Sequence, residues 1–353
     1  MAALRAALQS AGLDAILISS RANTRYLTGF TGSSSLLVIS HQDATLITDF
    51  RYRTQARLEV GCAADVEIEG TSLWTKLWAV LPRHTAISVG FESPHTTHAD
   101  FQRIVDSGAR WQWRPTTGIV EGLRQRKDAG ELAHIRAAVA IAEEALRRTV
   151  PEMRAGVTEL AVAARLEFTL RDLGSEAHPF ETIIASGQRS ALPHARCSTK
   201  SLAKGDLVIV DFGAVSGGYC SDITRTFVVG KASENQREGY AVVHEANASA
   251  SAAVRAGMRG RDADALARDY IERRGFGPEF GHSLGHGIGL EIHEAPRLAR
   301  TIDAPLPEGA VVTIEPGIYR EGWGGVRIED DVYLSAAGPV VLTSFRRDLV
   351  ELG

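Results

Sequence analysis

Two aspartates lie on either side of a predicted hairpin turn. The segment DFGAVSGGYCSDITRTF, which begins at Asp211, has β-type runs on both sides of its Ser-Gly-Gly, and this pattern predicts a β-hairpin. If the turn is the Ser-Gly pair, Asp211 lies directly opposite Asp222; if it is the Gly-Gly pair, the register changes but both carboxylates stay on one face. Like charges this close destabilise a sheet, so the pair needs either a compensating cation or exposure to water at a sheet edge.

Two glutamates interrupt apolar, strand-like runs further along the chain. Glu315 lies within VVTIEPGIY, and Glu329 lies within GGVRIEDDVYL, where Arg327 shares its face because residues two apart on a strand point the same way. A charge inside an apolar strand is costly unless it is paired or bound to a metal. The neighbouring Asp330 and Asp331 are interpreted instead as solvated or loop-facing residues that bind no metal.

Three histidines lie in the glycine-rich segment HSLGHGIGLEIHE, between the hairpin and the two glutamates. They are His282, His286 and His293. The helical HExxH zinc motif is excluded, because Ser283 stands where that motif has glutamate and each glycine would cost a helix about 1 kcal/mol. A single histidine in such a loop is most often structural, but three histidines beside four strand carboxylates favour a metal or catalytic site.

Four carboxylates and one imidazole match a pair of divalent cations in charge. Two such cations would balance the ionised side chains of Asp211, Asp222, Glu315 and Glu329, with His286 neutral. Without cations, two carboxylates ~5 Å apart repel by roughly 3 kcal/mol at an effective dielectric constant of about 20, which a marginally stable protein could not easily absorb for every pair. Oxygen-rich ligands with one imidazole favour Mn²⁺, with Zn²⁺ or Co²⁺ as alternatives.

Strands and helices that alternate along the chain would position these groups. Strands are predicted at 15–19, 36–40, 44–48 and 86–91, and helices at 1–11, 52–60, 72–80, 97–107, 129–149, 158–173, 233–256 and 262–274. The alternation in the first third indicates a small α/β unit. The charged, glycine-containing segment GLRQRKDAG, near 122–130, indicates a domain boundary.

Length and composition limit the classes of function. With 353 residues, the chain is long enough for about two domains. Its net charge of −4 provides no basic surface for nucleic acid, and no apolar stretch approaches the ~20 residues of a membrane span. Polar residues interrupt the N-terminal segment, which argues against a signal peptide, and three cysteines argue against a disulfide framework. We therefore expect a cytoplasmic location without nucleic-acid or membrane partners.

The residues that could bind metal resemble a known ligand set. Asp211, Asp222, His286, Glu315 and Glu329 resemble the five metal ligands of the pita-bread metallopeptidases. The histidine block resembles the signature of their Xaa-Pro branch, prolidase and aminopeptidase P, while NTRYLTGFTGSS and TDFRY resemble its creatinase-type N-terminal domain.

This resemblance implies an architecture and a cofactor. The expected fold is α+β, with a creatinase-type α/β N-terminal domain over 1–122 and a pita-bread catalytic domain, a curved antiparallel sheet with covering helices, over 123–353. Two divalent metal ions per chain and a homodimer are also implied.

The same resemblance implies roles for individual residues. His194, His293 and Glu315 would be catalytic, with Glu315 also a metal ligand that accepts the proton of the attacking water and the histidines hydrogen-bonding the intermediate or returning a proton. His282 would line the proline pocket and Arg327 would lie beside the metals, so both are expected to bind substrate.

The expected reaction is metal-dependent hydrolysis of the Xaa-Pro bond in proline-containing di- or oligopeptides. An Xaa-Pro dipeptidase (prolidase) is slightly preferred over an Xaa-Pro aminopeptidase that acts on longer peptides. A dipeptidase must cap the proline carboxylate, for which Arg51, Arg53 and Arg196 are candidates. The remaining alternatives are a methionine aminopeptidase, a creatinase-like C–N hydrolase and a metal-free peptide-binding protein of the same fold.

Two further groups of residues are interpreted as structural. Cys220 shares strand parity with Asp222 but is expected to be a small buried filler. The four tryptophans of the first third are expected to be core or dimer contacts rather than a binding site; they are Trp74, Trp78, Trp111 and Trp113.

Overall fold

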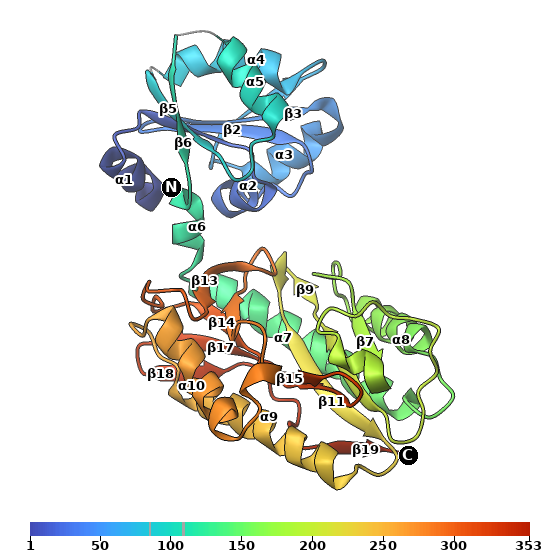
Figure 1. Ribbon diagram of the computed structural model, residues 1–353. Helices are drawn as coiled ribbons and strands as arrows, with labels where there is room; N and C mark the ends of the chain where they lie inside the picture. The colour runs from blue at the N-terminus through green and yellow to red at the C-terminus, as the bar shows by residue number, and fades with distance from the viewer. Residues whose placement is uncertain (85, 108–109) are drawn as a thin grey trace. The chain divides into compact units, whose positions relative to one another are not determined.

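The chain divides into two compact units, Met1–Arg124 and Gln125–Gly353 (Figure 1). The computed structural model describes residues 1–84, 86–107 and 110–353. Each unit has hydrophobic cores built around its own sheets. Among the described residues, no helix combines the length and the apolar character that a bilayer crossing requires.

A mixed six-stranded sheet forms the centre of the first unit. Its order is β4-β3-β2-β1-β5-β6, in which β1, β2 and β3 pair antiparallel and the outer strands are added in parallel. Its central strands are continuous apolar runs, which is the pattern of strands covered on both faces. The strands are β1 (Ala15–Ile18), β2 (Ser35–Ser40), β3 (Ala44–Asp49), β4 (Asp65–Glu69), β5 (Ser88–Glu92) and β6 (Gln112–Thr116).

Helices pack on both faces of this sheet. Ile16 of β1 packs in one core with Leu4, and Leu17, which points to the opposite face, packs in the other core with Leu77. The four tryptophan rings contact one another in this second core, which confirms their interpretation as core residues. The helices are α1 (Ala2–Ser10), α2 (Arg21–Thr28), α3 (Arg53–Val60), α4 (Leu73–Val80), α5 (His98–Asp106) and α6 (Ile119–Arg124).

The second unit contains a four-stranded sheet, a five-stranded sheet and two short ribbons. The first has the order β19-β11-β8-β7 and is antiparallel except for β19, and the second has the antiparallel order β13-β12-β14-β17-β18. The ribbons are β9–β10 and β15–β16. The strands are β7 (Ile183–Ser186), β8 (Leu207–Phe212), β9 (Val215–Ser216), β10 (Tyr219–Cys220), β11 (Ile223–Val229), β12 (Gly285–Gly287), β13 (Glu294–Leu298), β14 (Val311–Ile314), β15 (Gly317–Arg320), β16 (Gly324–Arg327), β17 (Asp330–Ser335), β18 (Gly338–Val341) and β19 (Val350–Leu352).

Four long helices cover the two larger sheets of this unit: α7 (Ala129–Thr149), α8 (Glu159–Asp172), α9 (Glu234–Ala253) and α10 (Gly260–Arg273). α7 and α8 share a core with β7, β8 and β11, whereas α9 and α10 share one with β14 and β17. Capping boxes begin α7 at Asp128 and α9 at Ser233. Short 3₁₀ segments are η1 (Phe50–Tyr52), η2 (Leu81–His84), η3 (Val150–Glu152), η4 (Gly187–Ala191) and η5 (Gly277–Glu279).

The predicted hairpin turns at its Gly-Gly pair. Gly217 and Gly218 have φ values of 56° and 81°, the left-handed conformation that a two-residue hairpin turn requires. This register places Asp211 opposite Thr224, so Asp222 is its diagonal neighbour on the same face. Of the two predicted registers, the chain therefore adopts the second, and the two aspartates are not directly opposite.

The long helices agree with the sequence prediction, and the predicted 129–149 spans Ala129–Thr149. In the first unit the prediction missed α2, α6 and the edge strands β4 and β6, and in the second unit it missed β7, β13, β18 and β19. α2 has little intrinsic helical propensity and is stabilised at its ends, because the Ser20 hydroxyl accepts the Asn23 N–H and Gly29 ends the helix at a φ of 77°.

Candidate functional site

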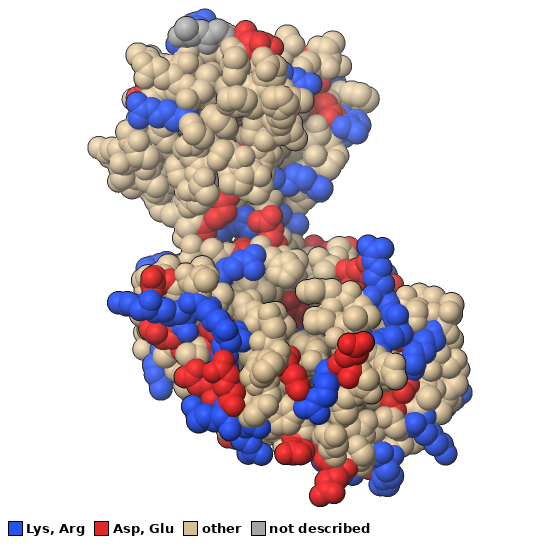
Figure 2. Space-filling view, viewed as in Figure 1, with Lys and Arg blue, Asp and Glu red and all other residues tan. Residues whose placement is uncertain are grey.

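A cavity of about 500 Å³ in the second unit brings together the residues that the sequence predicts to be functional. Figure 2 shows a hollow on the visible face of this unit with acidic side chains recessed inside it. Its lining includes Asp211, Asp222, His286, Glu315 and Glu329 together with His194, His282, His293 and Arg327.

The four carboxylates reach the cavity from strand ends. Asp211 lies at the end of β8, Asp222 precedes β11, Glu315 follows β14, and Glu329 lies between β16 and β17. Three of them are buried, with exposed fractions of 7% for Asp211, 5% for Asp222 and 2% for Glu329.

His286 reaches the cavity because glycines on both sides let its strand approach its neighbours. A Cβ at Gly285 would lie 1.9 Å from the Thr313 carbonyl oxygen, and one at Gly287 would lie 2.3 Å from the Ala295 carbonyl oxygen. The prediction that this segment is not a helix is therefore confirmed. The segment forms strand β12, which lies between β13 and β14 in the sheet. The glycine pattern reflects this close backbone approach.

The tautomer of His286 is fixed by its backbone contact. Its Nδ1 lies 3.1 Å from the Gly287 carbonyl oxygen, which can only accept a hydrogen bond, so Nδ1 carries the proton. The lone pair is then on Nε2, which lies 3.5 Å from Glu315 Oε1 and 3.9 Å from Asp222 Oδ2. A backbone acceptor behind one nitrogen is the usual way in which proteins orient a metal-binding imidazole.

Asp222, His286 and Glu329 form a cluster that could hold a metal ion. Each of these buried residues offers one ligand atom, and the atoms lie within 4.8 Å of one another. Two buried oxygens, Oδ1 of Asp211 and Oδ1 of Asp222, have no hydrogen-bond partner in the described part of the structure. Buried carboxylate oxygens without donors fit a cation, so the residues present suit the divalent metal that their chemistry implies.

Crowding of these acids changes their protonation. Burial, with repulsion from Glu329 and Asp211, raises the pKa of Asp222 well above its ordinary value, and burial with repulsion from Glu315 does the same to the pKa of Glu329. Burial also raises the pKa of Glu315 to about 8 and lowers that of His286 to about 4. Without a cation, Asp222, Glu315 and Glu329 therefore favour their protonated forms, and His286 keeps its Nε2 lone pair free.

Arg327 connects the acidic cluster to His282 through a tyrosine. Arg327 bonds Asp211 Oδ2 through Nη2 and donates from Nη1 to the Tyr319 hydroxyl at 2.7 Å. His282 Nδ1 faces the Ser283 carbonyl at 2.8 Å and so carries the proton, which makes Nε2 the acceptor of the Tyr319 hydroxyl at 3.1 Å. Tyr319 was not predicted to be a site residue, although it lies on β15 and follows Glu315 by only four residues.

His293 and His194 lie at the exposed part of the cavity lining. The His293 ring meets the His286 ring edge to face, with centroids 4.4 Å apart, and burial lowers its pKa. Arg196 and Arg297 also line the cavity. Arg297 lies opposite His286 in the pairing of β12 with β13, and it was not predicted to be a site residue. The other carboxylate-capping candidates, Arg51 and Arg53, belong to the first unit.

Asp330 and Asp331 are not solvated, so that prediction was wrong. Both are 0% exposed because their strand, β17, lies between β14 and β18. Asp331 Oδ2 accepts the backbone N–H of Asp222 at 3.1 Å, and Asp330 pairs with Arg225 and Arg347. Cys220, by contrast, is 5% exposed, as expected of a buried filler.

Comparisons with known proteins agree with this geometry. The pattern of metallopeptidase family M24 matches residues 133–336, and that of the creatinase/prolidase N-terminal domain matches residues 1–126. A solved Xaa-Pro dipeptidase from Bacillus anthracis has a TM-score of 0.96 and 41% identity, covering 99% of this chain and 98% of that chain.

Two further proteins are similar over nearly their whole lengths. A solved X-Pro aminopeptidase from Thermotoga maritima has a TM-score of 0.91 and 40% identity, covering 98% of both chains. An Xaa-Pro dipeptidase from Pyrococcus horikoshii is 34% identical over 339 residues, 96% of this chain and 95% of that protein. These likenesses confirm the predicted fold class.

Proposed function

The chain belongs to metallopeptidase family M24, and from this premise we propose that it is an Xaa-Pro dipeptidase that hydrolyses the peptide bond before proline. One observation carries the proposal: Asp222, His286 and Glu329 converge to within 4.8 Å, and Asp211 and Glu315 line the same cavity. The relatives named as Xaa-Pro dipeptidases cover nearly the whole chain, which supports this substrate class.

The five predicted ligands would hold two divalent ions. Orphaned oxygens on Asp211 and Asp222 and the free lone pair of His286 support binding of cations there. The oxygen-rich set favours Mn²⁺, with Zn²⁺ or Co²⁺ as alternatives. When bound, such ions polarise a scissile carbonyl and acidify a water molecule.

Side chains of the cavity would handle protons and position the substrate. Glu315 Oε1, at the cavity wall, accepts a proton from the attacking water. His293 is neutral at neutral pH because burial lowers its pKa, so it can hydrogen-bond the intermediate. It can also take up, at its free ring nitrogen, the proton that Glu315 received from the water and so pass a proton on to the proline nitrogen. His194 contacts the substrate at the exposed lining, and His282 and Arg327 shape the wall against which the proline ring packs.

Cationic residues in the cavity favour a dipeptide. Proline at the C-terminus of a substrate carries a free carboxylate, and Arg196 and Arg297 both line the cavity. A guanidinium group binds a carboxylate through two parallel hydrogen bonds. A substrate that ends at proline would therefore find a counter-ion in the cavity; for Arg196, its carboxylate would compete with Glu181, the present partner at 3.5 Å.

An aminopeptidase that acts on longer peptides is the second candidate. A further hollow of about 770 Å³ shares His282 and Ser283 with the site cavity and offers space for residues beyond proline. The 40% identity to a protein named X-Pro aminopeptidase also favours this alternative.

A small peptide panel tests the proposal. Metal-stripped protein is reconstituted with Mn²⁺, Co²⁺ or Zn²⁺ and assayed with Met-Pro, a Met-Pro-Pro tripeptide and Met-Ala-Ser. We expect rapid hydrolysis of Met-Pro alone. Faster cleavage of the tripeptide would identify the aminopeptidase, activity only on Met-Ala-Ser would indicate a methionine aminopeptidase, and purified protein that binds no metal would indicate a peptide-binding protein.

Three further predictions from the sequence accompany this proposal. They are a homodimer, a cytoplasmic location and a boundary between residues 122 and 123 that separates the creatinase-type domain from the catalytic domain. The peptide panel does not depend on any of them, so each needs its own measurement.

A further inference from the structure

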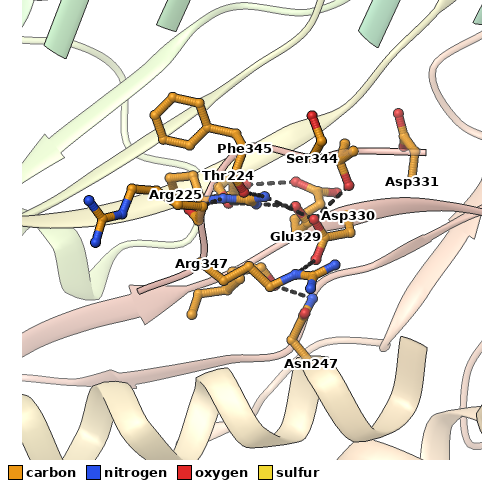
Figure 3. A network of polar contacts seen from close by, with 12 residues as sticks. Thr224, Arg225, Asn247, Glu329, Asp330, Asp331, Ser344, Phe345 and Arg347 are labelled. Atoms are coloured by element: carbon orange, nitrogen blue, oxygen red, sulfur yellow. Dashed lines mark hydrogen bonds and ion pairs between the residues drawn. The ribbon is translucent and has the colours of Figure 1, made fainter. Parts of the chain in front are cut away.

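Buried polar contacts hold the backbone of the segment that carries Glu329. Figure 3 shows Arg225, Glu329 and Asp330 converging in the protein interior, with Asn247 reaching toward them from α9. Glu329 lines the cavity, but Arg225 and Asn247 do not. Neither residue was predicted to have a functional role.

Asn247 contacts the residues that precede two predicted metal ligands. It is 0% exposed, on a helix face otherwise formed by small and apolar residues. Its Nδ2 donates to the Ile314 carbonyl at 2.9 Å and to the Ile328 carbonyl at 3.2 Å. Since Ile314 precedes Glu315 and Ile328 precedes Glu329, one amide group fixes the spacing of the two glutamate backbones.

Arg225 fixes the other side of the Glu329 peptide. Its Nη1 donates to the Glu329 carbonyl at 2.6 Å and to the Thr224 carbonyl at 2.9 Å, and its Nη2 donates to Asp330 Oδ1 at 2.9 Å. Nη2 and Nε also donate to the carbonyls of Phe345 and Arg346, at 2.7 and 3.1 Å. All five N–H donors of the guanidinium are therefore used, which the three donors of lysine could not reproduce.

Thr224, next to Arg225 on β11, completes the set of contacts to Glu329. Its carbonyl accepts the Glu329 N–H at 3.1 Å, and its hydroxyl donates to Glu329 Oε2 at 2.6 Å. The backbone N–H, the backbone carbonyl and one carboxylate oxygen of Glu329 thus all have partners on β11. Such a ligand has little freedom to adjust its position.

We propose that Asn247 and Arg225 are positioning residues that hold Glu315 and Glu329 at the separation needed to bind two divalent ions. This inference rests on the proposed metallopeptidase function. Outer-shell partners that orient metal ligands typically contribute 10–100-fold in metal affinity. A purely structural role would instead change thermal stability and leave the affinity of the folded protein for metal unchanged.

The first test compares two substitutions on one face of α9. Asn247→Leu replaces the amide that donates to both carbonyls by an apolar side chain of similar size. The control is Ser251→Ala, one turn later, which removes a buried hydroxyl that has no hydrogen-bond partner in the described chain. Mn²⁺ is titrated calorimetrically into metal-stripped proteins below their melting temperatures. We expect Asn247→Leu to weaken Mn²⁺ binding 10–100-fold and to lower kcat more than it raises KM, with Ser251→Ala like the wild type.

The second test compares the two arginines that pair with Asp330. Arg225→Lys keeps at most three of the five donors that hold Glu329, Asp330 and the C-terminal segment, whereas Arg347→Gln removes a single bond, the 2.6 Å contact to Asp330 Oδ2. We expect both to lower Tm, and only Arg225→Lys to weaken Mn²⁺ binding. This pair decides the question if Asn247→Leu does not fold.

Two outcomes separate this inference from the proposed function. Wild-type protein that binds no divalent ion would overturn the function. Wild-type protein that binds Mn²⁺, with Asn247→Leu and Arg225→Lys binding equally tightly, would overturn the inference alone.

Discussion

Glu329 and Asp330 are adjacent in the chain and both are buried, with exposed fractions of 2% and 0%, yet their surroundings are opposite. Burial alone would raise the pKa of Asp330, but Arg225 and Arg347 lower it below its ordinary value. Burial and repulsion from the other carboxylates raise the pKa of Glu329. One carboxylate is neutralised by the chain itself, and the other is not.

This difference separates a structural charge from a functional one. Buried charges occur in stable proteins when the chain supplies counter-ions and hydrogen bonds, as it does around Asp330. Where buried acids face one another, the missing positive charge must come from protons or bound cations. The incomplete neutralisation, rather than burial, therefore identifies the site.

The largest effect is expected from the acids that the chain leaves unneutralised. Asp222→Asn removes a predicted ligand, so we expect loss of at least one metal ion and turnover of Met-Pro reduced to background. Elemental analysis of the purified variant and a dipeptide assay measure both. Asp172→Asn, on an exposed side chain, is the control and should behave like the wild type. Full metal content in Asp222→Asn would remove it from the ligand set.

A smaller loss is expected beside the cluster. His293→Ala should reduce kcat by roughly 10²–10⁴, the range of a proton-transfer group, while metal content stays that of the wild type. Steady-state kinetics at saturating Mn²⁺, with elemental analysis in parallel, checks this. Unchanged turnover would exclude His293 from the chemistry and limit the functional region to the acids and His286.

The two adjacent acids should respond oppositely in stability. Asp330→Asn breaks a buried ion pair and should lower the free energy of unfolding by about 3–5 kcal/mol. Glu329→Gln replaces an acid whose raised pKa keeps it protonated without metal by an amide of similar size, so the stability of metal-stripped protein should not fall. Urea unfolding of the two metal-stripped variants measures the contrast. Equal destabilisation would contradict the division between neutralised and unneutralised acids.

The smallest effect is a pH dependence restricted to the metal-free protein. The pKa of Glu315 is about 8 in the folded state and ordinary in the unfolded state, so folded protein binds the additional proton and its stability falls as pH rises toward 8. Buried His286, with its pKa lowered to about 4, has the opposite effect, but only below about pH 6.5.

Between pH 6.5 and 8 the histidine effect is therefore absent, and Glu315 contributes on the order of 2 kcal/mol. Asp222 and Glu329, whose pKa values are also raised, contribute with the same sign. Calorimetric melting of metal-stripped protein should show a falling Tm across this window. Mn²⁺-saturated protein should not, because a bound cation keeps Glu315 ionised. Glu315→Gln should reduce the slope without metal, and the same slope with and without Mn²⁺ would contradict the assignment.

Much of the candidate site was visible in the sequence because its groups violate local patterns. Carboxylates inside apolar strands and histidines among glycines stand out whatever the tertiary fold is. The long helices followed from apolar periodicity, such as the buried stripe of α7 that includes Leu132, Ile135 and Leu146. Tyr319 and Arg297 were missed because a tyrosine and an arginine on amphipathic strands are ordinary until the partner across the cavity is known.

The sequence by itself determined which side chains had to be compensated and which face of the hairpin they share, because strand parity is a local property. It did not determine which compensation each acid receives. Asp330 was predicted to be solvated, yet it meets Arg225 and Arg347, which lie 105 and 17 residues away along the chain. Only packing of β17 against the C-terminal segment and β11 brings those cations to Asp330 and leaves Glu329 facing other acids, because Coulombic interactions depend on distance in space rather than in sequence.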